Sequence, residues 1–526
     1  MSKKWIIIMV LVLIMGVFFV SCAPDEADVP AEEPEEPEEA ISDKHGGILR
    51  FAFYAPTNMD PAFLSTIADE HIARQYSDHL VFIDEENMPD INRSIAKNWE
   101  SNDEAMVWTF ELREGITFHD GKEMTSEDVK FTYDRLRDPD IGAATVDMYS
   151  NIVDITTPDD YTVIFELEES NVDFLLDLAD YHALVMDTDN PDFNTNFNGT
   201  GPFMVERYEP EDRIIFTRNP DYWMTDDEDN QLPYLDGMEF LFISDSSAQI
   251  EALRGGQVDY LIYLSAEFVP MLEEDENTVV YEAPSNTAWV IRMRSDQPPA
   301  DDVRVRQAFK AATDRSAILK GAIDGLGVTG RDTPIGPAYG DFYLDVPEPE
   351  RDVEKAKELL AEAGYEDGLE ITITTQESSP VPAIATIWQE QLAEAGINAE
   401  IQLVPSDVYF GADNMWLEVD FGITDWGSRP YPQPYLDLAY TSDAPWNETH
   451  WSDSELDELA RQAGRELDHD KRIQLYHEIQ EIFMERGPII VPFFNNNLWG
   501  ASADLKGVQP TSGLGTALDL RTVYFE

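Results

Sequence analysis

The sequence predicts an α/β fold with more than one domain. Short runs of β-branched and aromatic residues alternate with amphipathic runs of helical spacing. The alternation is most regular in the second half, as expected of an α/β lobe. The chain has 526 residues, and a folded part of about 480 can form two or more domains. No repeat with a period of about 20–50 residues is visible, which argues against a solenoid or propeller.

The first 22 residues have the pattern of a secretory signal. Lys3 and Lys4 precede an apolar run over 5–20, and Ser21 and Cys22 follow it. The run is shorter than the ~20 residues needed to cross a membrane as a helix, although an uncleaved anchor is the alternative. Residues 19–22, Phe-Val-Ser-Cys, resemble a bacterial lipobox, with Phe19 an unusual residue at its position. Cys22 is the only cysteine, so it cannot form an internal disulfide; we expect it to be the lipid anchor.

Residues 23–45 are predicted to be a disordered spacer. They are dominated by Glu, Asp, Pro and Ala, with almost no large apolar side chains to bury, and their like charges repel. Such a segment would let a folded domain stand clear of a membrane.

The rest of the chain is also strongly acidic. There are 105 acidic and 35 basic residues, a formal charge of -70, and only ten of the acids lie in the spacer. This charge disfavours a nucleic-acid partner. Self-repulsion is screened over about 8 Å at 0.15 M salt and about 3 Å at 1 M, so we expect a salty environment and a halophilic acidic surface. The 43% hydrophobic and 11% aromatic content fits a folded protein.

Seven segments carry the residues typical of strands: 46–55, 107–113, 161–167, 238–244, 289–294, 369–376 and 397–404. The helices are clearer. Asp352 can cap a helix that ends near Gly364, and residues 383–396 form a second helix that leads into the strand at 397–404. Two further amphipathic helices are predicted near the C-terminus, in SELDELARQAGREL and KRIQLYHEIQEIFMERG.

Several motifs in order resemble one family, the large solute-binding proteins of ABC importers for peptides, nickel and related solutes (family 5). The most specific is WTFELREGITFHDGKEMTSEDVKFTYDRL at 108–136, in which Gly115 and Gly121 suit turns and Thr125 or Ser126 can cap a helix. GTGPFMV, RNPDYW, LRGGQVD, DDVRVRQAFKAATDR and PWNETHWSDSELDEL follow in the family's order. The resemblance extends from about residue 46 to the C-terminus.

The resemblance implies a two-lobed, periplasmic-binding-protein-like fold of type II with an extra subdomain. The first lobe would comprise 46–88, 190–288 and 490–526, the inserted subdomain 89–189, and the second lobe 289–489. It also implies a monomer, anchored to the outer face of the cytoplasmic membrane, that captures a small-molecule or peptide ligand by lobe closure and passes it to the transmembrane subunits of an ABC permease. In this scheme His119 and Asp120 are turn residues and not a site.

The expected ligand site lies in TDWGSRPYPQPYLDLAYTSDAPWN at 424–447. In peptide-binding relatives an aspartate three residues after a tryptophan holds the peptide's amino group; here Trp426 is followed at that spacing by Arg429. A guanidinium favours a carboxylate or another anionic oxygen, so a free peptide N-terminus is disfavoured there. A peptide held otherwise, an opine-like or sugar-acid compound, an oligosaccharide or a nickel complex stays open. Arg429 as an ordinary surface arginine is the alternative.

Further candidate wall residues are Tyr54, Trp289, Trp446 and Asn447, together with Trp426 itself. Aromatic residues in such a protein are more often part of the core than of a ligand wall.

A secreted hydrolase is the alternative from a different class. Paired acids carry no information in so acidic a chain, and there is no HExxH, GxSxG or Walker motif. The eight histidines lack ligand spacing, and Cys22 is assigned to the anchor. We therefore expect no catalytic residues, no metal and no cofactor.

Overall fold

The computed structural model describes residues 44–526, apart from 86, 191, 412–413 and 513–518. These residues belong to one compact unit, Ser42–Glu526. The predicted signal peptide, Cys22 and nearly all of the predicted spacer lie outside the described residues. The names first lobe, inserted subdomain and second lobe are kept below for the ranges given above, whose exact boundaries stay a prediction.

One sheet of eleven strands runs through both lobes, and the predicted α/β class is confirmed. Its order is β15-β14-β16-β12-β17-β11-β1-β10-β9-β8, with β13 paired to β17. The strands are β1 (Ile48–Phe53), β8 (Phe203–Glu209), β9 (Arg213–Arg218), β10 (Gly237–Phe242), β11 (Tyr260–Leu261), β12 (Thr278–Met293), β13 (Gly327–Thr329), β14 (Leu369–Gln376), β15 (Ile397–Val404), β16 (Phe421–Trp426) and β17 (Ile489–Ser502).

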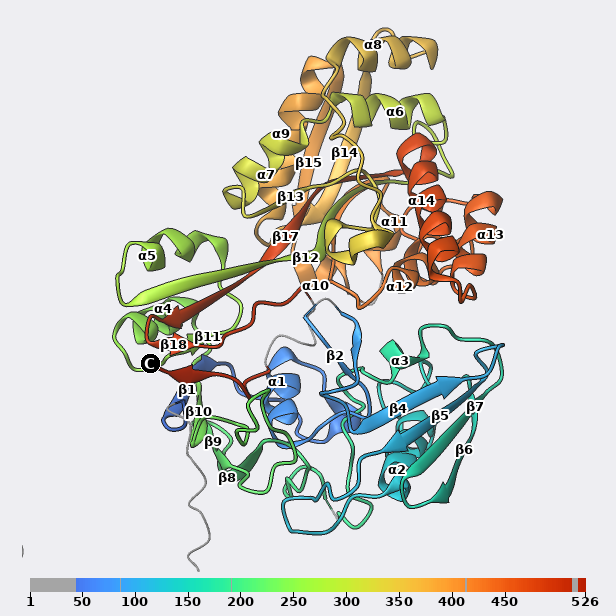
Figure 1. The fold of residues 1–526 in the computed structure, drawn as a ribbon. Helices are drawn as coiled ribbons and strands as arrows, with labels where there is room; N and C mark the ends of the chain where they lie inside the picture. The colour runs from blue at the N-terminus through green and yellow to red at the C-terminus, as the bar shows by residue number, and fades with distance from the viewer. Residues whose placement is uncertain (1–43, 86, 191, 412–413, 513–518) are drawn as a thin grey trace, which may run out of the picture. The chain divides into compact units, whose positions relative to one another are not determined.

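The long antiparallel pair β12 and β17 joins the first lobe to the second (Figure 1). Its register shifts between Pro284 and Ala288, so that residues 285–287 leave the regular ladder. At this interruption Ser285 donates to the carbonyl of Asn495, 2.8 Å away. A break in the ladder where two lobes meet is a natural position for a hinge.

The second lobe shows how the sequence dictates this arrangement. In β14, buried Leu369, Ile371 and Ile373 alternate with exposed residues, and α8 (Val353–Glu362) and α9 (Val381–Glu394) contribute to the same apolar core. Asp352 accepts the backbone N–H of Lys355 as the predicted cap. Gly364 follows the helix with φ of +93°, a conformation that glycine adopts without strain.

The inserted subdomain has a separate four-stranded sheet in the order β4-β5-β7-β6. Its core is aromatic, with Tyr133 and Phe110 each packed edge-to-face against Phe165. The elements are β4 (Ala96–Ser101), β5 (Val107–Leu112), β6 (Ile152–Asp159), β7 (Thr162–Leu167), α2 (Ser126–Arg137) and the short α3 (Phe174–Asp177).

The longest sequence motif is a scaffold, as predicted. Gly121 has φ of +87° in the turn after Asp120, which accepts the backbone N–H of Lys122. Thr125 is the N-cap of α2, and Asp128 accepts the Thr125 backbone N–H. The His119 ring bonds to the carbonyl of Gly201 at 3.0 Å. These contacts serve the turn and its attachment to residues 199–201.

The GTGPF motif is explained by close backbone packing. A Cβ on Gly199 would lie 1.9 Å from the carbonyl oxygen of Tyr76, and one on Gly201 would lie 2.5 Å from the Tyr76 carbonyl carbon. Only glycine therefore allows this segment to approach the end of α1 (Ile67–Tyr76) so closely.

The other helices are α4 (Ser246–Arg254), α5 (Val269–Glu273), α6 (Val303–Ala312), α7 (Arg315–Ile323), α10 (Ser406–Tyr409), α11 (Met415–Glu418), α12 (Gln433–Tyr435), α13 (Ser454–Ala463) and α14 (His469–Arg486). Two short strand pairs, β2 (Phe82–Ile83) with β3 (Pro89–Asp90) and β18 (Leu505–Lys506) with β19 (Tyr524–Phe525), complete the described α-helices and strands.

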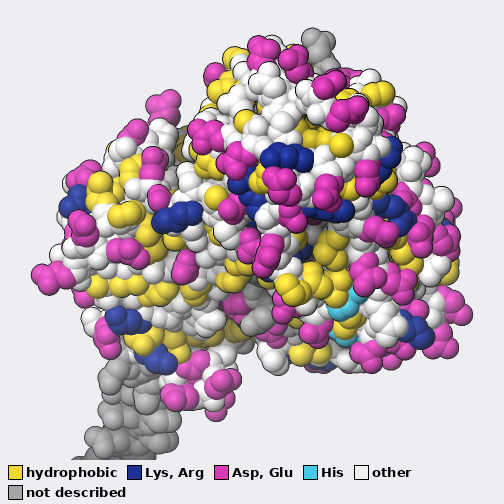
Figure 2. All heavy atoms as spheres, turned by 90° about the horizontal axis from the view of Figure 1, so that it is seen from above, with side chains coloured by type: hydrophobic (Ala, Val, Ile, Leu, Met, Phe, Trp, Pro, Cys, Tyr) yellow, Lys and Arg dark blue, Asp and Glu magenta, His cyan; other side chains and the backbone are white. Residues whose placement is uncertain are grey.

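Acidic side chains are spread over the surface. Asp and Glu outnumber Lys and Arg on the face drawn in Figure 2, as the composition requires. Across the described residues no helix combines the length and apolarity needed to cross a bilayer.

Candidate functional site

A cavity of about 270 Å³ lies where α1 of the first lobe, residues 179–181 of the inserted subdomain and residues 428–430 of the second lobe meet. Its volume lies just below the range of about 300–1,000 Å³ usual for small-molecule sites, and its position between lobes is typical of such a site. The lining is mixed, with polar and charged side chains beside a few apolar ones: Ser65, Thr66, Ile67, Glu70, Arg74, Ile83, Asn87, Ala179, Asp180, Tyr181, Ser428, Arg429 and Pro430.

Two residues of this cavity have unused bonding capacity: Asn87, whose buried Oδ1 has no hydrogen-bond partner, and Arg429. The Nε atom of Arg429 is buried and has no hydrogen-bond partner, and no ion pair to its guanidinium occurs within the described residues. Its loop is nevertheless firmly held. The Arg429 carbonyl accepts the Tyr339 hydroxyl at 2.8 Å, and the Tyr435 hydroxyl bonds to the carbonyl of Gly427 at 2.9 Å. The backbone is thus fixed while the charged end of the side chain stays available.

The acids in the cavity wall are already paired. Arg74 Nε donates to Glu70 at 2.9 Å within α1, and Asp180 lies 2.7 Å from His182 Nδ1. Although burial opposes it, this bond to Asp180 raises the pKa of His182. Both carboxylates have cationic or hydrogen-bonding partners, whereas no ion pair to the Arg429 guanidinium occurs among the described residues. The guanidinium can therefore bind an anionic group on a solute.

Tyr181 provides a neutral hydrogen-bonding group close to this charge. Burial, with the charges of Asp180 and Glu70, raises the pKa of Tyr181 to about 12, and the charge of Arg429 opposes that rise. The phenol is therefore protonated at ordinary pH and can donate a hydrogen bond next to the guanidinium.

Trp426 lies three residues before Arg429, in the core and outside the cavity lining. It ends β16, and its Nε1 donates to Glu448 at 3.0 Å. Glu448 also accepts from Thr424 and lies 3.3 Å from Arg292, and both charged side chains are 0% exposed. This buried network fixes the strand from which the Arg429 loop emerges.

Trp446 and Asn447 lie on the far side of the same segment. Trp446 is 41% exposed, and its ring centroid is 6.1 Å from that of Trp426. The Asn447 side chain bonds within its own turn, donating to the Trp451 carbonyl at 2.8 Å and accepting from Thr449. Neither residue lines the cavity.

Trp289 and Tyr54 are placed separately. Trp289 is buried on β12, opposite Asp425 of β16, and its Nε1 has no hydrogen-bond partner. Tyr54 follows β1 and stacks on Phe53 at 4.2 Å. Burial, with the charge of Asp69, raises its pKa.

Of the six predicted ligand residues, Arg429 alone lines the cavity, and the ligand-binding roles of all six stay predictions. Sequence reasoning missed Glu70, Asp180 and Tyr181, which come from remote segments. Their one local signal is Glu70 and Arg74 at helical i,i+4 spacing, which any surface helix also shows.

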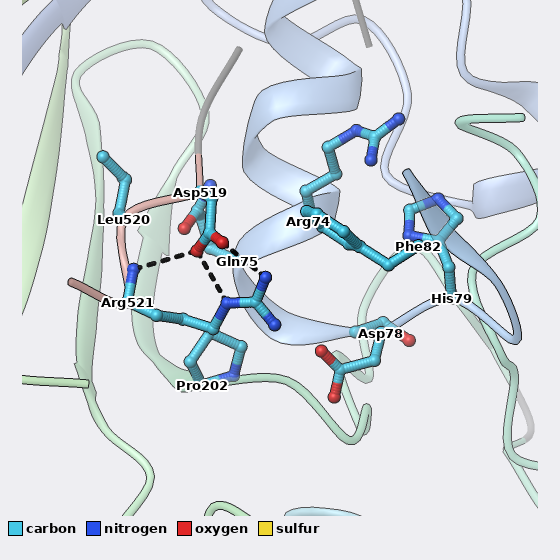
Figure 3. A pocket seen from close by; sticks show the side chains of 10 residues that line it. Arg74, Gln75, Asp78, His79, Phe82, Pro202, Asp519, Leu520 and Arg521 are labelled. Carbon is cyan, nitrogen blue, oxygen red and sulfur yellow. Dashed lines mark hydrogen bonds and ion pairs between the residues drawn. The ribbon is translucent and has the colours of Figure 1, made fainter. Parts of the chain in front are cut away.

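A second cavity is too small for a solute. It has about 30 Å³, the space of roughly one water molecule. Figure 3 shows its wall, in which the Arg521 guanidinium pairs with Asp519 while Asp78 lies nearby. Tyr222 and Trp223 donate to Asp78 at 2.9 and 3.1 Å. Within the first lobe, this network joins the C-terminal segment to Asp78 and Tyr222.

No group of three or more His, Cys, Asp or Glu side chains in the described part of the chain is arranged to hold a metal ion.

Comparison with known proteins agrees with this architecture. The family model "Bacterial extracellular solute-binding proteins, family 5 Middle" matches residues 90–447. The chain is 26% identical over 434 residues to the dipeptide-binding protein of Escherichia coli, covering 76% of this chain and 79% of that protein. It is 27% identical over 472 residues to di/tripeptide-binding protein 1 of Pseudomonas aeruginosa, covering 83% and 86%. The structure of HbpA2 from Haemophilus parasuis superposes with a TM-score of 0.81 at 23% identity, covering 91% of this chain and 99% of that one. The two-lobed, periplasmic-binding-protein-like fold is thereby confirmed.

Proposed function

The chain belongs to the bacterial extracellular solute-binding proteins of family 5, and we propose that it captures a peptide or peptide-like solute that bears a carboxylate. The family consists of binding proteins and not enzymes, so the secreted hydrolase is set aside. In this proposal the captured solute passes to the transmembrane subunits of an ABC permease.

One observation carries the ligand chemistry: the Arg429 guanidinium in the cavity between the lobes, with its Nε buried and unpartnered. A charge-assisted, bidentate bond to a carboxylate would satisfy it. The names of two relatives, a dipeptide-binding and a di/tripeptide-binding protein, support a peptide-like solute.

Capture needs no covalent step. The solute would enter while the lobes are apart, and rotation about the interrupted ladder of β12 and β17 would bring residues 428–430 onto α1 and residues 179–181. Closure is then favoured by the contacts that the solute makes with the second side of the cavity.

The N-terminal prediction adds a membrane attachment. Lipidation at Cys22, followed by the acidic spacer over 23–45, would keep the protein at the outer face of the cytoplasmic membrane. The surface charge supports a role in a salty medium, where it would be screened.

Mass spectrometry of the solute released by denaturing the purified protein tests the proposal. We expect a compact peptide-like compound with at least one carboxylate. A neutral oligosaccharide or a nickel complex would contradict it and favour the corresponding alternative, and an opine-like or sugar acid would keep the role of Arg429 but replace the peptide.

A further inference from the structure

The loop that carries Arg429 is bound to the inserted subdomain through a neighbouring residue. Tyr431, two positions after Arg429, donates its hydroxyl to Oδ1 of Asp177 at 2.7 Å. Asp177 is the last residue of α3. Pro430 and Pro432 flank Tyr431 and restrict the backbone on both sides, so a displacement of Tyr431 is transmitted to Arg429.

Asp177 is fixed from the side of the subdomain. Its Oδ2 accepts from Asn171 at 2.7 Å, and its carbonyl oxygen accepts the hydroxyl of buried Tyr149, also at 2.7 Å. The carboxylate is therefore held in place for Tyr431 by groups within the subdomain.

A second bond joins the same short helix to the second lobe. Asp173, the N-cap residue of α3, forms a buried ion pair with Arg472 of α14. Arg472 is held on its own side, because its Nε donates to the Ala463 carbonyl at 3.0 Å. The two contacts thus join residues that are each held by hydrogen bonds within their own part of the molecule.

The surroundings of these bonds are open and charged. A groove of about 940 Å³ separates subdomain residues such as Glu168 and Asp173 from second-lobe residues such as Asp437 and Asp457. Among the described helices and strands, none from the subdomain packs broadly on α12, α13 or α14. An interface of a few polar bonds beside an acidic groove can open at low cost, unlike a packed apolar seam.

We propose that α3 of the inserted subdomain is a latch for solute capture, in which Asp177 positions the Arg429 loop through Tyr431 and Asp173 holds Arg472 when the lobes close. The inference rests on capture by lobe closure, the proposed function. It makes Tyr431 and Asp177 positioning residues: they contact no solute, yet they set the fraction of protein whose Arg429 loop meets α1.

The latch predicts a measurable shift between closed and open protein. The full chain would carry Cys22→Ala and two nitroxide labels, at Thr156→Cys on exposed β6 and at Glu478→Cys on exposed α14. Double electron–electron resonance then gives the distances, both as purified and after solute removal by unfolding and refolding. We expect Tyr431→Phe, which loses one hydrogen bond to a carboxylate, to lower the closed-to-open ratio about tenfold.

Tyr161→Phe is the matched control, because it also removes a tyrosine hydrogen bond to a carboxylate, that of Glu123 at 2.6 Å, within the subdomain and away from α3. It should leave the distances unchanged, and Asp177→Asn, which keeps an acceptor, should retain more closed protein than Asp177→Ala. Unchanged distances in Tyr431→Phe, or an equal fall in Tyr161→Phe, would overturn the latch. So would a wild type with only the long distance in both preparations. These readouts do not depend on which solute is found, so the latch and the proposed ligand can fail separately.

Discussion

Tyr431 and Asp177 lie 254 positions apart in the chain and share a 2.7 Å hydrogen bond. This bond places the subdomain beside the loop that carries Arg429, whose Nε is buried without a hydrogen-bond partner in the wall of the cavity between the lobes. The cavity, the loop and the latch therefore form one connected unit, and the predictions below test its parts.

Arg429→Ala should weaken binding of a carboxylate-bearing solute by roughly tenfold to a hundredfold, because a charge-assisted bond contributes about 1.5–3 kcal/mol. Thermal stability should change little, since the Nε has no protein partner to lose. Isothermal titration calorimetry with the solute identified by mass spectrometry measures the first effect. Arg461→Ala, at an exposed arginine of α13, is the control; equal affinities in the two variants would remove Arg429 from the site.

Lowering the pH should favour closure of the lobes, because closure buries the carboxyl group of Asp177. Burial, opposed by the bonds from Tyr431 and Asn171, raises the pKa of Asp177 to about 7. Its charged and titratable surroundings are Asp173, Asp180 and Tyr149 in the subdomain and Tyr431, Asp437 and Arg472 in the second lobe. Opening would return the carboxyl to an ordinary pKa of about 3.9.

Because the closed form binds the proton more tightly, the closed-to-open ratio is highest below about pH 4 and falls as the pH rises to about 7. We expect a decrease of more than about tenfold between pH 5 and pH 8, measured by the same label distances. Asp177→Asn should lose this dependence, and the wild-type pH profile in that variant would refute the assignment.

Glu448→Gln should destabilise the second lobe. It leaves Arg292 fully buried without its anionic partner, a change that costs about 3 kcal/mol. Urea unfolding followed by tryptophan fluorescence measures the loss, because Trp426 bonds to Glu448. Glu478→Gln on the exposed face of α14 serves as the control, and matching midpoints in the two variants would show that the network does not stabilise the fold.

Asp519→Asn should lower stability at pH 7 but not at pH 2. Although burial opposes it, the neighbouring Arg521 and Arg93 lower the pKa of Asp519 to about 2. A carboxyl group whose pKa is lower in the folded protein than its unfolded value near 3.9 stabilises the fold above about pH 3.9. This stabilisation is lost as the pH falls to about 2. At pH 7 the free energy of unfolding of the variant should be lower than that of the wild type by about 2 kcal/mol. Denaturant unfolding at both pH values measures this difference. A difference that persists unchanged at pH 2 would exclude the ionic cause.

The sequence predicted the elements whose pattern is local. β14, β15, α8 and the cap at Asp352 follow from alternation, helical spacing and a capping side chain. The central strands of the sheet were harder to predict from the sequence. Only 289–294 was predicted of β12, which begins at Thr278 and includes Pro284 and a register shift, and β17 contains Pro492 and three consecutive asparagines. Such residues break the alternation that identifies a strand.

The candidate site could likewise be predicted only where the sequence has a local pattern. Arg429 was predicted from its loop and its spacing to Trp426, yet Trp426 itself packs in the core beside Glu448. Asp180, Tyr181 and Glu70 join Arg429 only through the tertiary fold, and no local pattern indicates that meeting. The latch bond between Tyr431 and Asp177 was likewise beyond local reasoning.

A crystal structure of the protein with its co-purified solute retained tests the central claim most directly. The account predicts the solute in the cavity between α1 and residues 428–430, with an anionic oxygen within hydrogen-bond distance of the Arg429 guanidinium. A solute bound elsewhere, or one that fills this cavity without contacting Arg429, would contradict it.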